Sequence, residues 1–443
     1  MLLSRALRLS PQLDTNRARA IALVGAGGKT TAIFQLAREL PPPILVTTTT
    51  HLGTWQIPLA DQHLVAQKTS DLDNYEFSGV TLIADSIQGD RVVGVNDDVL
   101  CWLCAYSKTH NITLLIEADG SRQKALKAPN QHEPVISEFT DTVIVVAGLS
   151  GLGKELNEEN VHRPQLFSTL CRLPLNESIT SDGLVCVLTH PNGGLKNIPP
   201  RAHRVILLNQ ADTSELQSIG GTMSAPLLEH FDSVIVGSLQ QSHFRTFERT
   251  AGIVLAAGGS TRFGRPKQLL DWRGEPFVRV VAQTALKAGL SPVVVVAGAN
   301  AVEVESKIKD LPLTIVRNEN WQSGQASSIR AGVKTLPEET GSAIFLLSDQ
   351  PQIPGSVIRA LTETHATELH PIVAPLVMME QRANPVLFDR LTFSDLLALE
   401  GDVGGRAIFS KYHVEYMPWH DDRLLLDVDK PEDYQRLIED DTL

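Results

Sequence analysis

The sequence has few cysteines, no excess of positive charge and no long apolar run. Its four cysteines are too few for a disulfide framework in a chain of 443 residues. The formal net charge of −12 disfavours a nucleic-acid surface, because a polyanion is repelled outside local basic pockets. Without a long uncharged apolar run or the apolar core of a signal peptide, neither a transmembrane helix nor a leader is expected. We therefore expect a soluble, cytoplasmic protein that binds neither nucleic acid nor membranes.

Two of the cysteines form a C-x-x-C pair, a spacing that occurs in redox and metal sites. Cys171 and Cys186 supply no second pair, and the residues between Cys101 and Cys104 are the apolar Trp102-Leu103. We interpret Cys101 and Cys104 as two small residues on one face of a helix, three positions apart.

The length exceeds that of most single domains, and short apolar strands alternate with helical stretches, which indicates α/β architecture with mainly parallel sheets. The first residues read as a helix. The polar, aperiodic stretch 237–250 is the expected boundary, which gives domains of residues 1–245 and 250–443. The expected buried strands are 21–24, 44–47, 81–84, 113–116, 142–146, 185–189, 205–208, 233–236, 252–255, 292–297, 313–317, 343–347, 372–375 and 413–417.

The most informative stretch follows the strand 252–255 and reads Leu255-Ala-Ala-Gly-Gly-Ser-Thr-Arg-Phe-Gly-Arg-Pro-Lys267. Glycines at a sharp strand-to-helix turn let backbone amides converge on an anion, because no Cβ blocks the approach. Arg262 and Lys267 add positive charge within reach of a triphosphate. The residues expected to bind the nucleotide here are Leu255, Ala256, Ala257, Gly258, Gly259, Ser260 and Gly264.

Acidic residues come near the ends of two later strands in this half. Asp349 follows the strand 343–347, and open α/β sheets bind ligands beyond the carboxyl ends of their strands. Asp427 and Asp429 alternate in Leu426-Asp-Val-Asp, which we expect to be a strand with both carboxylates on one face, before Pro431 opens a helix. On spacing alone, a helix cap or turn is the commoner role of such aspartates.

This half resembles the MobA-like nucleotidyltransferases, and specifically the molybdenum cofactor cytidylyltransferases. The family pattern L-A-A-G-x-S-x-R-x-G-x-x-K is met at every fixed position from Leu255 to Lys267, and Asp349 opens the family's D-Q-P. The resemblance covers about the last 190 residues, roughly one domain. It implies a three-layer, GT-A-like α/β fold, with Arg262, Lys267 and Asp349 as catalytic residues and Mg²⁺ held by Asp349 and Asp429.

Three further segments carry the same resemblance. Asn318–Arg330 is similar to the family's N-x-x-W-x-x-G segment, in which Gly324 and Ser328 would donate to the base or the phosphates. Residues 401–406 match G-D-x-G-x-R, a loop suited to an anionic acceptor. Asparagine replaces the histidine of the family's G-H-P-V-L-F, and Lys430 replaces a threonine, two departures that bear on the acceptor more than on the nucleotide. The implied acceptor-binding residues are Asn384, Asp402 and Arg406.

The resemblance implies an enzyme that transfers CMP from CTP to molybdopterin and releases pyrophosphate. The terminal phosphate of molybdopterin would attack the α-phosphate in line, so positioning and charge neutralisation are required and a general base is not. Ala257 favours cytosine, because guanylyltransferase relatives carry L-A-G-G and the added methyl leaves less room for a purine. A guanylyltransferase, another small-molecule phosphate nucleotidyltransferase and a non-catalytic cofactor carrier stay open as alternatives.

The N-terminal half has its own glycine-rich turn, Gly25-Ala-Gly-Gly-Lys-Thr-Thr31, between a strand and a helix. Backbone amides and Lys29 would cradle phosphates, and the Thr30 hydroxyl would reach Mg²⁺. The strict G-x-x-x-x-G-K-[ST] spacing fails because Leu23 stands where the first glycine belongs, so we expect a P-loop-like variant. A glycine turn without a ligand is the alternative. The candidate nucleotide-binding residues are Gly25, Gly27, Gly28, Lys29, Thr30 and Thr31.

Other segments of this half support a nucleotide site. The strand 113–116 ends in Glu117 and Asp119, where an NTPase places its metal-associated acid, and Asp119 is the candidate metal ligand. Asn209-Gln210-Ala-Asp212 resembles the guanine-reading N-K-x-D of GTPases, with glutamine in place of lysine. His132-Glu-Pro134 and His162-Arg-Pro164 are either site loops or surface turns.

Together G-A-G-G-K-T-T, E-A-D-G-S, H-E-P and V-H-R-P resemble the YqeC-type family, accessory proteins of selenium-dependent molybdenum hydroxylases, over residues 15–240. The resemblance implies an NTPase-like module that assists a molybdenum hydroxylase apoenzyme. We therefore expect two Rossmann-like α/β/α modules, the first P-loop-like and the second a nucleotidyltransferase.

Overall fold

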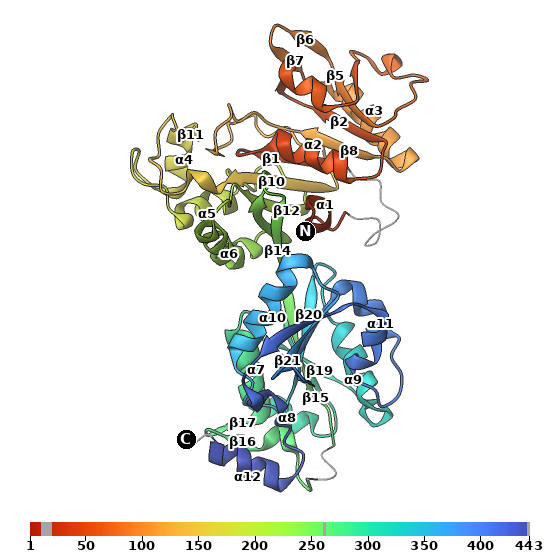
Figure 1. Cartoon of the computed structure of the whole chain (residues 1–443), viewed down its shortest axis with the longest axis vertical. Helices are drawn as coiled ribbons and strands as arrows, with labels where there is room; N and C mark the ends of the chain where they lie inside the picture. Colours follow the sequence, from red (N-terminus) through yellow and green to blue (C-terminus); the bar gives the residue numbers. More distant parts are fainter. Residues whose placement is uncertain (10–19, 260–262, 441–443) are drawn as a thin grey trace. The chain divides into compact units, whose positions relative to one another are not determined.

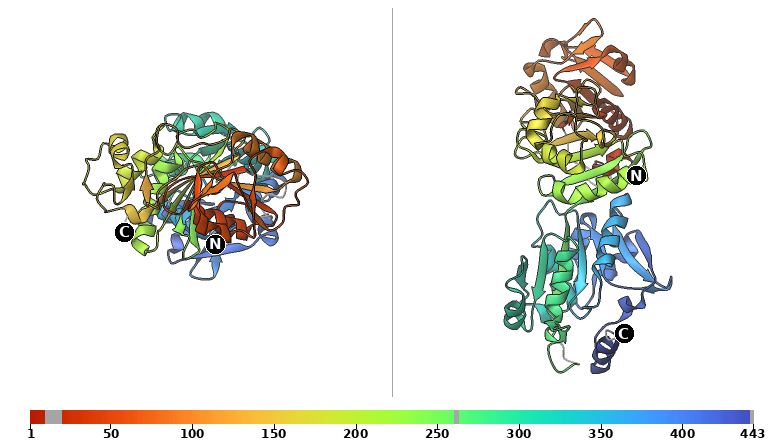
Figure 2. Two further views of the ribbon diagram at one scale, coloured as in Figure 1. Left: turned by 90° about the horizontal axis from the view of Figure 1, so that it is seen from above. Right: turned by 90° about the vertical axis from the view of Figure 1, so that its left-hand side faces the viewer.

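The computed structural model describes residues 1–9, 20–259 and 263–440, and the chain divides into two compact units, Met1–Phe247 and Glu248–Leu443. In each unit a central sheet has helices on both faces (Figure 1), and Figure 2 shows these layers from two other sides. The predicted fold class of two three-layer α/β/α modules is therefore confirmed. Within the described ranges, no helix combines the length and the apolar character that a membrane span needs.

The N-terminal unit is built on a nine-stranded sheet with the order β14-β13-β12-β10-β1-β8-β2-β5-β4. Neighbouring strands from β13 to β4 pair in parallel. Its strands are β1 (Ala20–Gly25), β2 (Ile44–Thr48), β4 (Gln62–Val65), β5 (Val80–Ala84), β8 (Thr113–Glu117), β10 (Thr142–Gly148), β12 (His203–Asn209), β13 (Ser233–Ser238) and β14 (His243–Glu248).

Two apolar cores lie on the two faces of this sheet. Helices α1 (Leu3–Ala6) and α2 (Lys29–Glu39) pack on one face. Helices α3 (Asp97–His110), α4 (Pro164–Cys171), α5 (Ser181–Thr189) and α6 (Ser214–Leu228) pack on the other. The smaller sheets are made of β3 (His51–Gly53), β7 (Arg91–Val93) and β6 (Ser86–Gln88), and of β9 (Leu126–Lys127) with β11 (Val161–His162).

The C-terminal unit has an eight-stranded mixed sheet with the order β19-β18-β15-β20-β23-β21-β22, and β24 pairs with β21. The core β19-β18-β15-β20 is parallel, whereas β23 is antiparallel to both of its neighbours. The strands are β15 (Thr250–Ala256), β18 (Val293–Ala297), β19 (Thr314–Arg317), β20 (Ser342–Leu347), β21 (Ile372–Val377), β22 (Gln381–Arg382), β23 (Val386–Asp389) and β24 (Val414–Trp419), with a separate hairpin of β16 (Asp271–Trp272) and β17 (Glu275–Pro276).

The helices of this unit also divide between two faces. Figure 1 shows α7 and α10 on one side of the sheet and α9 and α11 on the other, in agreement with two separate apolar cores. The helices are α7 (Phe277–Lys287), α8 (Ala301–Ile308), α9 (Gln325–Val333), α10 (Gly355–Glu368), α11 (Phe393–Leu397) and α12 (Pro431–Asp440).

Three local predictions were wrong. The apolar run 185–189, predicted as a strand, belongs to α5, where Thr180 caps the helix by accepting from the Gly183 amide at 3.1 Å. The stretch 237–250, predicted to be irregular, contains the edge strand β14. Residues 426–429, predicted to be a strand, follow a short 3₁₀ helix and lie outside every strand of the described structure, although Pro431 does open α12.

The cysteine pair matches its interpretation. Cys101 and Cys104 both lie on α3, Cys104 is buried, and both are free thiols.

The order of the strands determines where ligands can enter. In the N-terminal sheet β1 lies between β10 and β8, and in the C-terminal sheet β15 lies between β18 and β20. The chain leaves both strands at points where the strand order reverses, and such points form crevices at the carboxyl edge of a sheet. Both glycine-rich loops follow these strands and therefore lie at the crevices.

Candidate functional site

The glycine-rich loop of the C-terminal unit opens onto a cavity of about 820 Å³. Leu255, Ala257, Gly258 and Gly259 line it, whereas Ala256 is buried at the end of β15. A Cβ on Gly258 would meet nothing within 4 Å, so the backbone of the loop is open to a ligand. Two predicted residues, Ser260 and Arg262, lie outside the described residues. Gly264 has a φ of +77°, which favours glycine.

Lys267 joins the glycine-rich loop to both acidic segments. Its Nζ donates to Asp349 Oδ2 at 2.9 Å and to Asp429 Oδ1 at 2.7 Å. Burial acts to lower the pKa of Lys267, but the two carboxylates outweigh it and raise the pKa above its usual value. The structure therefore brings together three predicted residues that are 82 and 162 positions apart in sequence, and all three line the cavity.

A third carboxylate lies behind this pair. Asp427 accepts from Gln350 Nε2 at 2.5 Å, and burial together with the nearby charges of Asp349 and Asp429 raises its pKa. Carboxylate oxygens are the ligands that Mg²⁺ prefers, and it commonly takes one or two of them. The donor set of Asp349 and Asp429 therefore fits such a cation, with Asp427 next to it.

The N-terminus of α9 forms another wall of the cavity. Gly324 has a φ of +105°, and a Cβ there would lie 2.5 Å from the Gly401 carbonyl oxygen. Asp402 lies over the helix end, where its Oδ1 accepts from the Gln325 amide at 3.1 Å. Ser328 also lines the cavity, and its hydroxyl accepts from the side chain of Asn318 at 3.0 Å. The loop predicted to bind an acceptor thus positions α9 through Asp402.

Asn384 and Arg406, the other predicted acceptor residues, contact each other. Arg406 Nη2 donates to Asn384 Oδ1 at 3.3 Å and to the Arg382 carbonyl oxygen at 3.4 Å. Burial lowers the pKa of Arg406, against the opposing charge of Asp427. The pair therefore adjoins the acidic segment through Asp427.

In the N-terminal unit the glycine-rich turn is tightly enclosed. Gly25, Gly27 and Gly28 have φ values of +96°, +86° and +126°. A Cβ on Gly27 would lie 2.5 Å from the Gly148 amide nitrogen, so only glycine fits there. Asn209 donates to the Gly27 carbonyl oxygen at 2.7 Å and accepts from the Leu239 amide at 3.0 Å. The asparagine of the GTPase-like segment therefore holds this turn in place.

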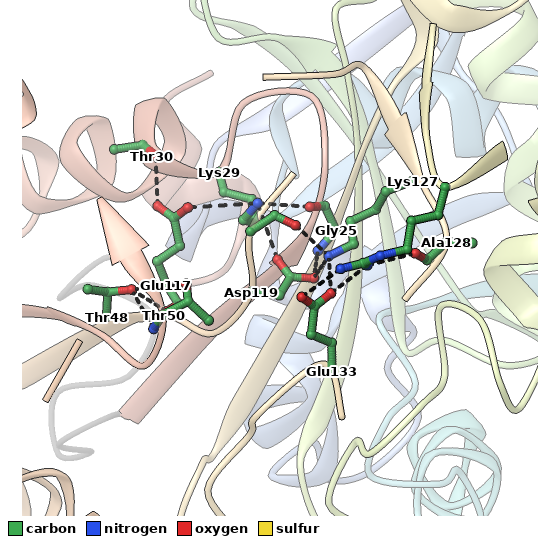
Figure 3. A network of polar contacts seen from close by, with 12 residues as sticks. Gly25, Lys29, Thr30, Thr48, Thr50, Glu117, Asp119, Lys127, Ala128 and Glu133 are labelled. Carbon is green, nitrogen blue, oxygen red and sulfur yellow. Dashed lines mark hydrogen bonds and ion pairs between the residues drawn. The ribbon is translucent and has the colours of Figure 1, made fainter. Parts of the chain in front are cut away.

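Lys29 and Thr30 meet the two acids that end β8 (Figure 3). Lys29 Nζ donates to the Gly25 carbonyl oxygen at 2.8 Å and lies 3.2 Å from Asp119 Oδ1 and 3.7 Å from Glu117 Oε1. The Thr30 hydroxyl donates to Glu117 Oε2 at 2.7 Å. Burial raises the pKa of Glu117, although Lys29 and Thr30 act in the opposite sense. The first turn of α2 is thus linked by charge to the end of β8.

A second buried lysine extends this network. Lys127 Nζ donates to Asp119 Oδ2 at 2.8 Å and to Glu133 Oε2 at 3.0 Å (Figure 3). The Arg163 guanidinium donates two hydrogen bonds to the Glu133 carboxylate, at 2.7 and 2.9 Å. Burial acts to raise the pKa of Glu133, but the two cations outweigh it and hold the pKa at about 2. The two segments interpreted as site loops or surface turns therefore meet in one charged cluster.

This cluster borders a cavity of the N-terminal unit with a volume of about 1220 Å³. Burial and the cations Arg163, Lys127 and Arg122 lower the pKa of His162 to about 4. The predicted Lys29, Thr30 and Thr31 line this cavity. Its chemistry suits an anionic ligand that would contact the first turn of α2.

Sequence reasoning missed some residues of both sites. Lys127 lies in Ala125-Leu-Lys-Ala128, and nothing in this sequence distinguishes it from a lysine on the surface, yet the residue is only 8% exposed. Gln350 was noted only as part of the D-Q-P pattern, although it binds Asp427. Gln350 and Asp427 are 77 positions apart, whereas Asp119 and Glu133 lie within eight positions of Lys127, but no periodic pattern marks either set of contacts.

Two family models match the chain. The model of the YqeC protein matches residues 21–165, and the model of the MobA-like NTP transferase domain matches residues 252–416. These ranges fall in the two structural units and contain the two glycine-rich loops.

Relatives match the two units separately. The chain is 32% identical over 233 residues to the YqeC protein of Escherichia coli (strain K12), covering 51% of this chain and 89% of that protein. It is 32% identical over 197 residues to a nicotine blue oxidoreductase of Paenarthrobacter nicotinovorans, covering 42% of this chain and 95% of that protein. It is 30% identical over 139 residues to a probable molybdenum cofactor guanylyltransferase of Bacillus cytotoxicus, covering 31% of this chain and 66% of that protein. The chain therefore belongs to the YqeC family in its N-terminal unit and is a MobA-like NTP transferase in its C-terminal unit.

Proposed function

We propose that the C-terminal unit, taken as residues 250–443, transfers CMP from CTP to molybdopterin and releases pyrophosphate. The observation that carries this proposal is the bridge of Lys267 between Asp349 and Asp429 beside an open glycine-rich loop. A cation next to paired carboxylates is what a phosphoryl or nucleotidyl transfer needs, because its catalysis rests on positioning and on charge neutralisation.

Each group has one task in this proposal. The amides of Gly258 and Gly259 bind phosphate oxygens, and Lys267 moves from the carboxylates to the phosphates as the nucleotide enters. Asp349 and Asp429 would hold Mg²⁺, which neutralises charge on the phosphates when it is bound. Asn384 and Arg406 would contact the anionic acceptor, since Arg406 supplies a positive charge beside the acidic segment.

The choice of base is the finer part of the proposal. Ala257, the second alanine of the loop, is 5% exposed and lines the cavity. Its methyl group removes space from the base, which favours cytosine over guanine. The relation to a guanylyltransferase favours the opposite base, so GTP is the second candidate substrate.

We also propose that the N-terminal unit, taken as residues 1–245, binds a nucleoside triphosphate and assists a molybdenum hydroxylase apoenzyme. Support comes from the cavity of about 1220 Å³ lined by Lys29, Thr30 and Thr31 and from the cations around it. Glu117 lines this cavity, and Asp119, which lies 3.2 Å from Lys29 Nζ, would be the ligand of a metal ion bound next to it. The turn is a P-loop-like variant in this proposal.

The first experiment measures pyrophosphate release by the full chain with molybdopterin, Mg²⁺ and each of CTP, GTP and ATP. We expect release with CTP, and loss of release in Lys267→Ala with the fold intact. Lys309→Ala is the matched control, since this exposed lysine lies at the end of α8, outside the cavity lining. Release with GTP alone would replace the cytosine assignment. Absence of release with every nucleotide would contradict the transferase proposal for this acceptor.

A second experiment addresses the N-terminal unit by nucleotide binding to the full chain. Two binding sites are expected for wild type, and Lys29→Ala should lose one of them while Lys267→Ala loses the other. If Lys29→Ala retains every site of the wild type with unchanged affinity, the N-terminal proposal is wrong and the C-terminal one is unaffected.

A further inference from the structure

Two histidines and a glutamate gather on the C-terminal unit at the amino ends of two strands. His370 lies in the turn between α10 and β21, His413 immediately precedes β24, and Glu415 is the second residue of β24. One ligand atom from each of the three side chains lies within 4.8 Å of the other two. Among the described residues this is the one group of three or more such side chains that meets this distance.

The spacing fits a small divalent ion. In a tetrahedral zinc site with bonds of about 2.0–2.1 Å, neighbouring ligand atoms lie about 3.3 Å apart. His413 Nε2 and Glu415 Oε2 are 3.4 Å apart, and the rings of His370 and His413 have centroids 6.0 Å apart. The third side chain therefore needs to approach by at most about 1.5 Å to complete a three-ligand shell. A change of rotamer is sufficient for such a shift.

The backbone under this group is held by a parallel strand pair. Ile372 pairs with Val414 and Val373 with Glu415, and this register continues to the pair of Val377 and Trp419. Among the described strands, β24 pairs with β21 alone, so it is an edge strand. The side chain of His413 is 70% exposed, which leaves the group open to ions from solvent.

The group is separate from the nucleotide cavity. Asp349 and the glycine-rich loop lie beyond the carboxyl ends of β20 and β15, whereas His370 and His413 lie before the amino ends of β21 and β24. Because β15, β20, β21 and β24 belong to one sheet and β21 runs antiparallel to β23, which runs antiparallel to β20, these four strands point the same way. The two sites therefore lie at opposite edges of the sheet.

We propose that His370, His413 and Glu415 bind one Zn²⁺ ion, which fastens the start of the edge strand β24 to the turn before β21. Two imidazoles and one carboxylate are a common zinc ligand set, and a water molecule occupies the fourth position. The ion stabilises the C-terminal unit, because the three ligands are brought together only in the folded chain. This site is independent of the proposed transferase activity.

The test is a calorimetric titration of the full chain with Zn²⁺ in a buffer containing excess Mg²⁺, which occupies sites made of oxygen ligands. Wild type is expected to bind one Zn²⁺, and His413→Ala should bind it at least roughly 100-fold more weakly. Glu415→Gln should weaken binding in the same direction. His420→Ala is the matched control, an exposed histidine one residue beyond the other end of the same strand.

A second readout uses thermal unfolding of the same proteins. Zn²⁺ should raise the melting temperature of the C-terminal unit in wild type and in His420→Ala, and leave that of His413→Ala unchanged. Equal zinc stoichiometry and affinity in wild type and in His413→Ala would overturn the proposal. An equal loss in His420→Ala would also overturn it, because binding would then not depend on the three-residue group.

Discussion

Replacing Lys127 by methionine should destabilise the N-terminal unit strongly. The side chain of Lys127 is 3% exposed, and its Nζ contacts Asp119 at 2.8 Å, Glu133 at 3.0 Å and the Gly120 carbonyl oxygen at 2.7 Å. Methionine keeps most of the volume and removes the charge. Asp119 would then be left buried with one lysine partner where it now has two.

The magnitude follows from the burial of the pair. Breaking a buried ion pair by removing one partner costs about 3–5 kcal/mol, because a charge stays buried without compensation. Asp119 keeps Lys29 at 3.2 Å and the Gly25 amide at 2.9 Å, so the lower end of the range, about 3 kcal/mol, is expected here. Against a typical domain stability of about 5–15 kcal/mol, this loss is easily measured.

The assay is urea unfolding of the full chain, with hydrogen exchange of β1 and β10 assigning the transition of the N-terminal unit. Lys154→Met is the matched control, an exposed lysine in the same unit. Adding Asp119→Asn to Lys127→Met should recover part of the loss, since the buried charge is removed with its partner. A loss below about 1 kcal/mol, or one equal to that of the control, would refute a buried and unscreened charge network.

Three further outcomes are expected. The pKa of Glu133 in the folded chain is about 2, below its ordinary 4.5, so ionised Glu133 stabilises the folded state above pH 4.5, and this contribution is lost as the pH falls towards 2. In acid unfolding, Glu133→Gln should therefore lack the part of the decrease in stability that comes from protonation of Glu133. Ala257→Gly should shift the ratio of kcat/KM for CTP over GTP towards GTP by about 10–200-fold, and an unchanged ratio would remove the methyl group from base selection. Gly324→Ala should lower the free energy of unfolding of the C-terminal unit, measured by urea unfolding, by about 1–3 kcal/mol, because its φ is +105° and the new Cβ would meet Gly401. In the same assay Gly258→Ala should be nearly neutral, because a Cβ there would meet nothing within 4 Å.

The parts of the fold that the sequence predicted are those with strong local signals. The strands before the two glycine-rich loops, and Pro431 at the start of α12, are each marked by neighbouring residues. The run 185–189 misled because valine-rich segments of five residues fit a strand and a buried helix equally well. The capping Thr180 was the signal that favoured the helix.

The candidate sites were predictable as motifs and less so as contacts. The sequence indicated that Lys267, Asp349 and Asp429 share a task, and the strand order explains why they meet. Lys127 could not be found, because the partners that bury it come from segments with their own separate patterns. The role of Asp402 was also missed, since capping across 77 positions leaves no local trace.

The lysine bridge between Asp349 and Asp429 has a consequence for the order of binding. An ammonium group already neutralises the two carboxylates, so it competes with any metal ion for the same oxygens. In the proposed reaction, a nucleotide that drew Lys267 to its phosphates would release the two carboxylates and so would strengthen their binding of the metal ion. By thermodynamic reciprocity, the metal must strengthen nucleotide binding by the same factor. We therefore expect the metal ion and the nucleotide to bind this site more tightly together than either binds alone.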